Sequence, residues 1–185
     1  MCRFTASLAA VLLAWSSLAL GVEPAAGEFW TTPAIAGYGR IHVLPQSAYK
    51  PDPAQTYHVV FALTKGSPQP GEVNPSLDRV ARTVNLYVAS GVPLSQLQFV
   101  AVAYGDATSL VLDDAHYKAA YGVANPNLPL IAALRHAGVD IAVCGQAVAE
   151  HDFQYEWVDP SVTLALSALT TISTLEERGY HLMQL

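Results

Sequence analysis

The chain has 185 residues, of which 52% are hydrophobic and 13% are charged, and its formal net charge is -6. This length fits one domain, and the high hydrophobic content excludes a disordered chain, which needs low hydrophobicity and high charge. The acidic balance, without any cluster of basic residues, excludes a nucleic-acid partner and leaves little attraction to anionic lipid surfaces.

Residues 1–26 have the pattern of a cleavable signal peptide. Arg3 supplies a positive charge, and an almost unbroken apolar run extends from Leu8 to Leu20. The run is about 13 residues long, whereas a membrane-spanning helix needs about 20. We therefore expect an exported, periplasmic protein without stable membrane insertion; the alternative is an uncleaved membrane anchor.

Residues 27–56 are predicted to form an irregular N-terminal arm. Prolines and glycines interrupt this stretch, which disfavours long helices and strands. The arm also contains large apolar side chains that a flexible linker rarely has: Phe29, Trp30, Ile35 and Ile41. We expect the arm to pack on the domain that follows it or on a neighbouring subunit.

Residues 57–185 alternate between strand and helix patterns. Tyr57–Leu63 is an almost continuous apolar run rich in β-forming residues, which is typical of a strand buried on both faces. Asn74 and Pro75 are typical of the cap and first position of a helix, which ends at Gly91. The later predicted elements, in chain order, are a strand at 97–104, a short strand at 110–112, a short helix at 114–121, a helix from Asn125 or Asn127 to Gly138, a strand at 139–143, one or two helical turns at 146–151, a short strand at 162–165, a helix at 167–178 and a strand at 180–185.

This alternation predicts an α/β fold, namely a three-layer α/β/α sandwich with a mostly parallel sheet of about five strands. In such folds, ligands bind outside the carboxyl ends of the strands. Two segments are expected at that edge of the sheet, residues 104–106 and residues 144–146.

Cys144 is the single cysteine outside the predicted signal peptide, because Cys2 lies within it. It cannot form an internal disulfide, so in an exported protein it is reactive, intermolecular or simply buried. A position between a strand end and a helix start favours a thiolate, since helix N-termini carry unpaired N–H groups and partial positive charge. A packing role remains an open alternative, because free cysteine is among the most buried residue types.

The residues around this thiol supply further candidates for a ligand site. Gly145 lets a backbone or a ligand approach closely because it has no Cβ, and Gln146 offers donors and acceptors beside the sulfur. Tyr104 can hydrogen-bond a ligand, and Gly105 follows it at the other strand end. If a helix runs on from Gly145, His151 lies two turns beyond the thiol on the same face, as a base, a second ligand or a solvated side chain.

The sequence contains no pattern that predicts a metal or a cofactor. Its six histidines are scattered, and neither H-x-x-x-H nor C-x-x-C occurs, so we expect no protein metal site. The chain also lacks G-x-S-x-G, P-loop and G-x-G-x-x-G motifs, and we expect no cofactor.

Several stretches converge on the pattern of one family: residues 81–87 with 89–93, 125–128, 137–139, 143–146, and 167–170 through 179–180. They resemble exported members of the DsrE/DsrF family of sulfur-relay proteins. The resemblance covers residues 57–185, and the arm also looks like that of exported members. One departure is Tyr104-Gly105, where relatives often have a His-Gly pair.

The resemblance implies a compact α/β/α domain that assembles into homo-oligomers, commonly trimers or hexamers. It also implies that a cysteine at the position of Cys144 can carry a persulfide. The outer sulfur atom comes from a donor and passes to an acceptor, and the partner is a protein or a small thiol. The first hypothesis is therefore an exported, sulfurtransferase-like persulfide carrier. The alternative is a non-catalytic homo-oligomer, either structural or with a small-ligand pocket between residues 104–106 and 144–146.

Overall fold

The computed structural model describes residues 29–185, and the predicted signal peptide lies outside this range. Its centre is a five-stranded sheet in the order β4-β3-β2-β1-β5, with every neighbouring pair parallel. The strands are β1 (Tyr57–Leu63), β2 (Leu97–Ala103), β3 (Asp140–Cys144), β4 (Thr163–Ala165) and β5 (His181–Gln184). Within residues 29–185, no helix combines the length and the apolar character needed to cross a bilayer.

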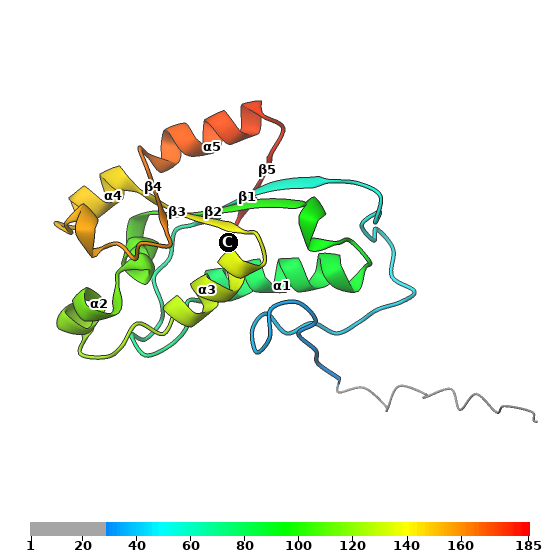
Figure 1. Cartoon of the computed structure of the whole chain (residues 1–185), viewed down its shortest axis with the longest axis horizontal. Coiled ribbons are helices and arrows are strands. Elements are labelled where there is room, and N and C mark those ends of the chain that lie inside the picture. The colour runs from blue at the N-terminus through cyan, green and yellow to red at the C-terminus, as the bar shows by residue number, and fades with distance from the viewer. Residues whose placement is uncertain (1–28) are drawn as a thin grey trace, which may run out of the picture.

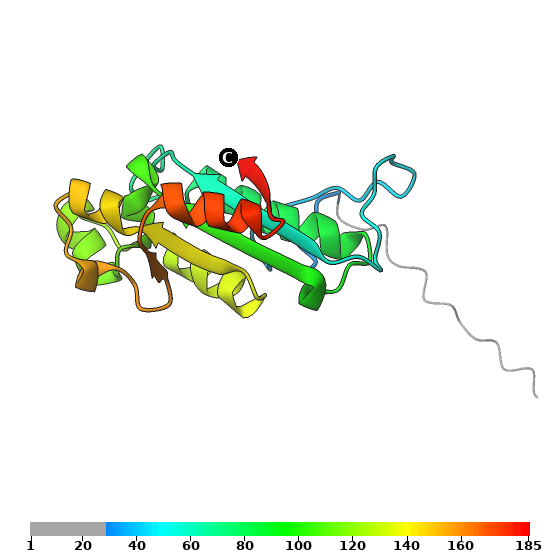
Figure 2. The same ribbon diagram turned by 90° about the horizontal axis from the view of Figure 1, so that it is seen from above.

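Helices cover both faces of this sheet (Figures 1 and 2). The helical elements are α1 (Pro75–Ala89), η1 (Leu94–Gln96), η2 (Gly105–Val111), α2 (Asp114–Tyr121), α3 (Leu128–His136), α4 (Gly145–Glu150), η3 (Tyr155–Trp157) and α5 (Ala168–Glu177). Helices α1 and α3 lie on one face and α5 lies on the other, while α2 and α4 lie at one end of the molecule. The predicted three-layer α/β/α sandwich is therefore confirmed, and its sheet is entirely parallel.

The alternation of side chains along each strand divides the core into two apolar clusters. In β1, Phe61 points toward α1 and α3 and packs edge-on against Phe99 at 5.4 Å between ring centroids. Val60 belongs to the smaller cluster beneath α5, together with Val102. Because side chains alternate between faces, Cys144 also lies on the α5 side of the sheet.

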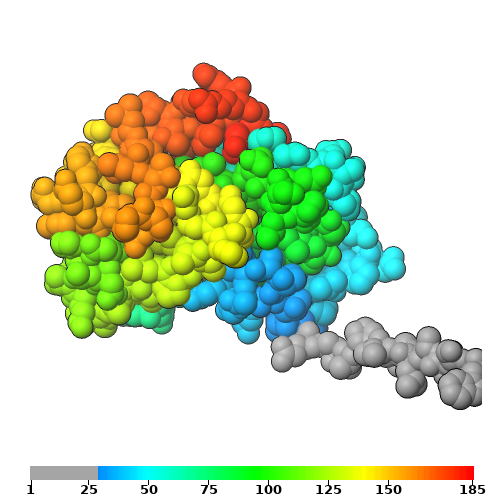
Figure 3. Space-filling view, in the orientation of Figure 1, coloured from blue at the N-terminus to red at the C-terminus, as the bar shows by residue number. Residues whose placement is uncertain are grey.

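The N-terminal arm packs on α1 through a buried asparagine. The Asn85 Oδ1 atom accepts hydrogen bonds from the backbone N–H groups of Ala34 and Ile35, each at 2.9 Å. Its Nδ2 atom donates to the carbonyl groups of Tyr38 and Gly39. Figure 3 shows the arm, coloured blue, against the surface of the domain. Four hydrogen bonds from one fully buried side chain thus hold an otherwise irregular segment in place.

The prediction of a strand at 110–112 is wrong. Residues up to Val111 belong to the 3-10 helix η2, and Leu112 makes only an isolated antiparallel bridge to Val158. Gly105 turns the chain with a φ of 56°, and the Thr108 hydroxyl donates back to the Gly105 carbonyl at 2.7 Å. A short apolar run fits a buried helical turn as well as a strand, so its pattern alone could not decide between them.

Candidate functional site

The two predicted site segments meet at the carboxyl edge of the sheet. Strands β2 and β3 pair with Ala103 opposite Val143, so Tyr104 and Cys144 leave the sheet side by side. Tyr104 is half-buried and packs against the same apolar cluster as Cys144. The structure therefore brings together the strand ends that the sequence predicts to be adjacent.

Cys144 lies where two helices begin. It is the last residue of β3 and also the N-cap of α4, and its Sγ atom accepts the Ala147 backbone N–H at 3.4 Å. The thiol donates to the Ser167 hydroxyl at 3.9 Å. Ser167 in turn caps α5, because its hydroxyl oxygen accepts the Leu169 backbone N–H at 3.2 Å. Only 5% of the Cys144 surface is exposed, so the sulfur is a buried group at a helix N-terminus.

Gly145 and Gln146 fasten α4 to the segment between β4 and α5. A Cβ atom on Gly145 would lie 2.9 Å from the carbonyl oxygen of Ala165. The lack of a side chain at Gly145 therefore lets the start of α4 lie close to the backbone of β4. The Gln146 side-chain amide donates to the Leu166 carbonyl at 3.3 Å. Both residues keep the loop that carries Ser167 beside the thiol.

His151 lies at the far end of α4 from the thiol. Seven residues at a helical rise of 1.5 Å per residue separate it from Cys144 by about 10 Å along the axis. Its Nε2 atom is 3.0 Å from the Gly105 carbonyl oxygen, and it must donate there because a carbonyl only accepts. The ring also stacks on Phe153, with centroids 5.5 Å apart. The structure thus joins His151 to Gly105 and leaves it out of contact with the sulfur.

Two small cavities open at this edge, and neither is lined by Cys144, Gly145 or Gln146. One has a volume of about 170 Å³ and lies between Tyr104 and one face of α5, from Ala168 to Glu176. The other, of about 250 Å³, is lined by Gly66, Ser67, Pro70, Asp106, Ser109, Tyr117, Tyr121 and His151. The structure therefore divides the predicted ligand residues between separate environments.

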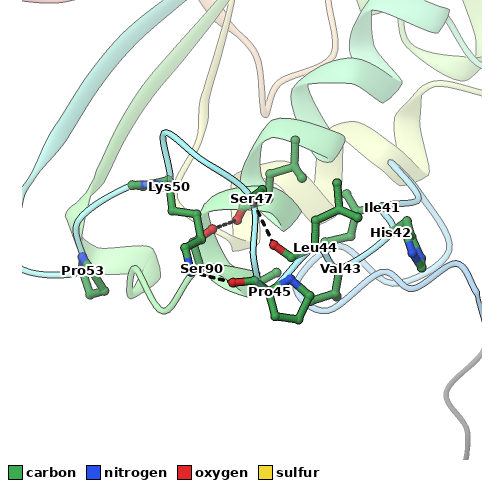
Figure 4. A pocket seen from close by; sticks show the side chains of 12 residues that line it. Ile41, His42, Val43, Leu44, Pro45, Ser47, Lys50, Pro53 and Ser90 are labelled. Atoms are coloured by element: carbon green, nitrogen blue, oxygen red, sulfur yellow. Dashed lines mark hydrogen bonds between the residues drawn. The ribbon is translucent and has the colours of Figure 1, made fainter.

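A larger cavity, of about 510 Å³, lies at the opposite edge of the sheet (Figure 4). It is bounded by the arm and by the last turn of α1, which runs antiparallel to the strands and so ends at their amino edge. Three of its polar side chains donate to backbone carbonyl groups close in the chain: Ser47 to Leu44, Lys50 to Pro45 and Ser90 to Leu86. This cavity is consequently remote from every predicted site residue.

Sequence reasoning missed two features of this edge. Ser167 could be expected to cap the helix at 167–178, but only the pairing of β3 with β4 brings it to the thiol. Tyr117 and Tyr121 are four residues apart, which places them on one helix face, and that spacing was the available signal for their pairing. In the described part of the chain, no three side chains of metal-binding type gather into a cluster.

An apolar surface adjoins the thiol. Three leucines around the end of β4 are exposed to solvent by 48%, 72% and 83%: Leu164, Leu166 and Leu169. Exposed large apolar side chains in one place are typical of a surface that another protein covers.

Comparison with known proteins places this fold in a family. The model of the DsrE/DsrF-like family matches residues 58–185. Among solved structures, the chain is similar to a protein of unknown function, MTH1491, from Methanobacterium thermoautotrophicum. That similarity has 16% sequence identity and a TM-score of 0.51, and it covers 70% of this chain and 99% of the other. No curated protein matches the sequence. From the match over residues 58–185, the chain belongs to the DsrE/DsrF-like family.

Proposed function

We propose that this protein is an exported carrier of sulfane sulfur, in which Cys144 accepts the sulfur as a persulfide and passes it on. Membership of the DsrE/DsrF-like family supports a role in sulfur relay. The observation that carries the assignment to one residue is the position of the thiol, between the first turn of α4 and the Ser167 cap of α5. Both neighbours offer hydrogen-bond donors to a thiolate, because the serine hydroxyl can rotate to donate.

The proposed transfer is an exchange in two balanced steps. The Cys144 thiolate attacks the outer sulfur of a donor persulfide, so a new S–S bond forms while the donor S–S bond breaks and the donor leaves as a thiolate. An acceptor thiolate then attacks the outer sulfur on Cys144, which returns to the thiolate form. Each step conserves the oxidation state of the pair, so neither an oxidant nor a reductant is needed.

The burial of the thiol adds a requirement to this proposal. Tyr104, Ala165 and Ala168 pack in the cluster that contains Cys144, so a donor reaches the sulfur only when this cover opens locally. The first turn of α5 is the mobile part in our proposal, because it joins the sheet through the short edge strand β4.

We further propose a periplasmic location and a homo-oligomer, a trimer or hexamer, with a donor or acceptor protein or a small thiol as partner. Export is supported by the apolar run of the N-terminal residues, and assembly by the exposed Leu166 and Leu169. These leucines follow β4, so a partner bound there would lie close to the thiol.

The experiment that tests this function compares the alkylation rate of Cys144 in folded and denatured protein at neutral pH. A carrier thiol reacts with the alkylating agent while the protein is folded. A thiol that reacts only after denaturation would contradict the proposal.

The second candidate is a non-catalytic binding or structural module of the same fold. The 5% exposure of Cys144 favours it, since a buried cysteine often serves packing alone. Under this alternative, replacing Cys144 by alanine changes stability and leaves every binding property intact.

A further inference from the structure

The cavity of about 250 Å³ at the carboxyl edge is built from four separate segments. The loop after β1 supplies Ser67, η2 supplies Asp106, α2 supplies Tyr117 and Tyr121, and the turn after α4 supplies His151. None of the thiol's contacts lines this cavity. The cavity is therefore separate from the surroundings of the thiol.

The loop wall of the cavity is held by side-chain hydrogen bonds. The buried Asn74 donates from Nδ2 to the Lys65 carbonyl at 2.7 Å, next to Gly66 in the lining. The Tyr117 hydroxyl donates to the Pro70 carbonyl at 2.9 Å. These two bonds fix both ends of the loop that forms one wall.

The η2 wall is held at both ends as well. His151 donates to the Gly105 carbonyl at its start, and Asn125 donates from Nδ2 to the carbonyl groups of Leu110 and Leu112 at 3.0 and 2.6 Å. The Asn125 Oδ1 atom accepts a hydrogen bond from Asn127 Nδ2, and the Asn127 Oδ1 atom accepts the backbone N–H of Asn74 at 2.7 Å. Among the described residues, no buried side-chain nitrogen or oxygen lacks a hydrogen-bond partner. Hydrogen bonds within the protein thus hold both walls of the cavity in place.

The chemistry of the lining is that of hydrogen-bond acceptors and aromatic faces. The Asp106 carboxylate makes no hydrogen bond or ion pair with residues 29–185 that would neutralise it. The Tyr117 and Tyr121 rings lie 4.6 Å apart at 43° to each other. Burial and the neighbouring Tyr121 raise the pKa of Tyr117, so this ring stays neutral. With Nε2 donating, neutral His151 keeps Nδ1 as an acceptor.

We propose that this cavity binds a small organic ammonium compound, with its charge between the Asp106 carboxylate and the rings of Tyr117 and Tyr121. Aromatic faces attract cations, and the carboxylate supplies the opposite charge. None of the eight lining residues is Lys or Arg, so the lining has no such cation to pair with an anion, and the Asp106 carboxylate would repel one. At roughly 30 Å³ for each water-sized group, the volume holds about eight non-hydrogen atoms.

A metal ion fits this lining less well than an ammonium group. Asp106 and His151 are its only side chains of the type that bind metals, whereas catalytic zinc sites use three protein ligands. The tyrosine pair would have no role around a metal, but it forms a natural wall for an alkylammonium group.

The test is a titration of the purified protein with ethylammonium and with choline, followed by amide NMR. We expect saturable shifts of the Gly66, Ser109 and Tyr121 amides. Asp106→Asn should weaken the affinity about tenfold or more, because it removes a charge-assisted contact. Tyr121→Leu should also weaken binding, whereas Tyr121→Phe keeps the ring and should bind nearly as well.

Two controls sharpen this result. Glu177→Gln makes the same charge change on α5 and should bind like the parent protein, and so should Cys144→Ser, which separates this site from the sulfur site. The proposal is overturned if neither probe gives saturable shifts at tens of millimolar, or if Asp106→Asn binds equally well. Stronger shifts of the same amides with acetate or zinc ions would also overturn it.

Discussion

The thiol of Cys144 and the hydroxyl of Ser167 are hydrogen-bonded at 3.9 Å although 23 residues separate them in the chain. The contact exists because β3 and β4 pair in parallel, with Cys144 opposite Ala165. The residue that caps α5 therefore also faces the only thiol of the described residues.

Replacing Ser167 by alanine should affect both partners of this contact. The change removes the cap of α5, which costs about 1 kcal/mol of unfolding free energy, and it should lower the alkylation rate of Cys144 at a fixed pH, because the hydroxyl no longer contacts the sulfur. Urea denaturation and alkylation kinetics measure the two effects. Ser173→Ala removes an exposed hydroxyl of the same helix and should change neither. An unchanged alkylation profile in Ser167→Ala would mean that the serine does not influence the thiol.

Gly145→Ala should destabilise the protein by about 1–3 kcal/mol, because the new methyl group would meet the Ala165 carbonyl oxygen at 2.9 Å. Gly71→Ala is the matched control, since nothing lies within 4 Å of its added Cβ. Urea midpoints of the two variants give the comparison. Equal midpoints would show that β4 yields easily and that Gly145 is not required for packing.

Asn85→Ala should release the N-terminal arm. It leaves buried backbone groups of the arm without partners, and we expect a loss of at least about 2 kcal/mol together with faster proteolysis between residues 29 and 56. The control is Thr83→Ala on the same helix. The Thr83 hydroxyl bonds only within α1, so its removal should leave the cleavage rate unchanged. Slow cleavage in both variants would show that other contacts hold the arm.

Asp113 should make stability depend on acid pH. Burial raises the pKa of Asp113, but hydrogen bonds from the backbone and ring of His116 lower it by more, so the folded pKa lies below the ordinary value. The carboxylate therefore stabilises the fold above about pH 4, and this contribution is lost as the pH falls through the folded pKa.

The variant Asp113→Asn isolates this charge, because asparagine caps a helix about as well as aspartate. Its urea midpoint should fall less between pH 6 and pH 3 than that of the parent protein. Urea denaturation of both proteins at pH values about one unit apart measures the difference. Glu177→Gln, on the exposed side of α5, should follow the parent curve. Parallel curves for Asp113→Asn and the parent would refute the assignment.

Local patterns predicted most of the fold. The apolar run of Tyr57–Leu63 and the Asn74-Pro75 pair have one reading each, as a buried strand and a helix start, and both predictions are confirmed. The run at 110–112 fits either a strand or a helical turn. Hydrogen bonds from Asn125 to the carbonyl groups of Leu110 and Leu112 favour the helical form.

The arrangement of the candidate site was less accessible to sequence reasoning. The strand pattern predicted Cys144 at the carboxyl edge of the sheet. Its contact with Ser167, which is 23 residues away in the chain, depends on the pairing of β3 with β4. His151 shares a helix with the thiol, yet α4 is six residues long and carries it toward Gly105 instead. Sites assembled from distant segments depend on tertiary pairing, which periodicity does not encode.

The decisive measurement is the intact mass of the reduced protein after incubation with a persulfide donor and then with an acceptor thiol. We predict a gain of one sulfur atom in the parent protein, its transfer to the acceptor in equal amount, and no gain in Cys144→Ser. A parent protein that gains no sulfur while folded, or a Cys144→Ser variant that gains as much as the parent, would contradict the proposed function.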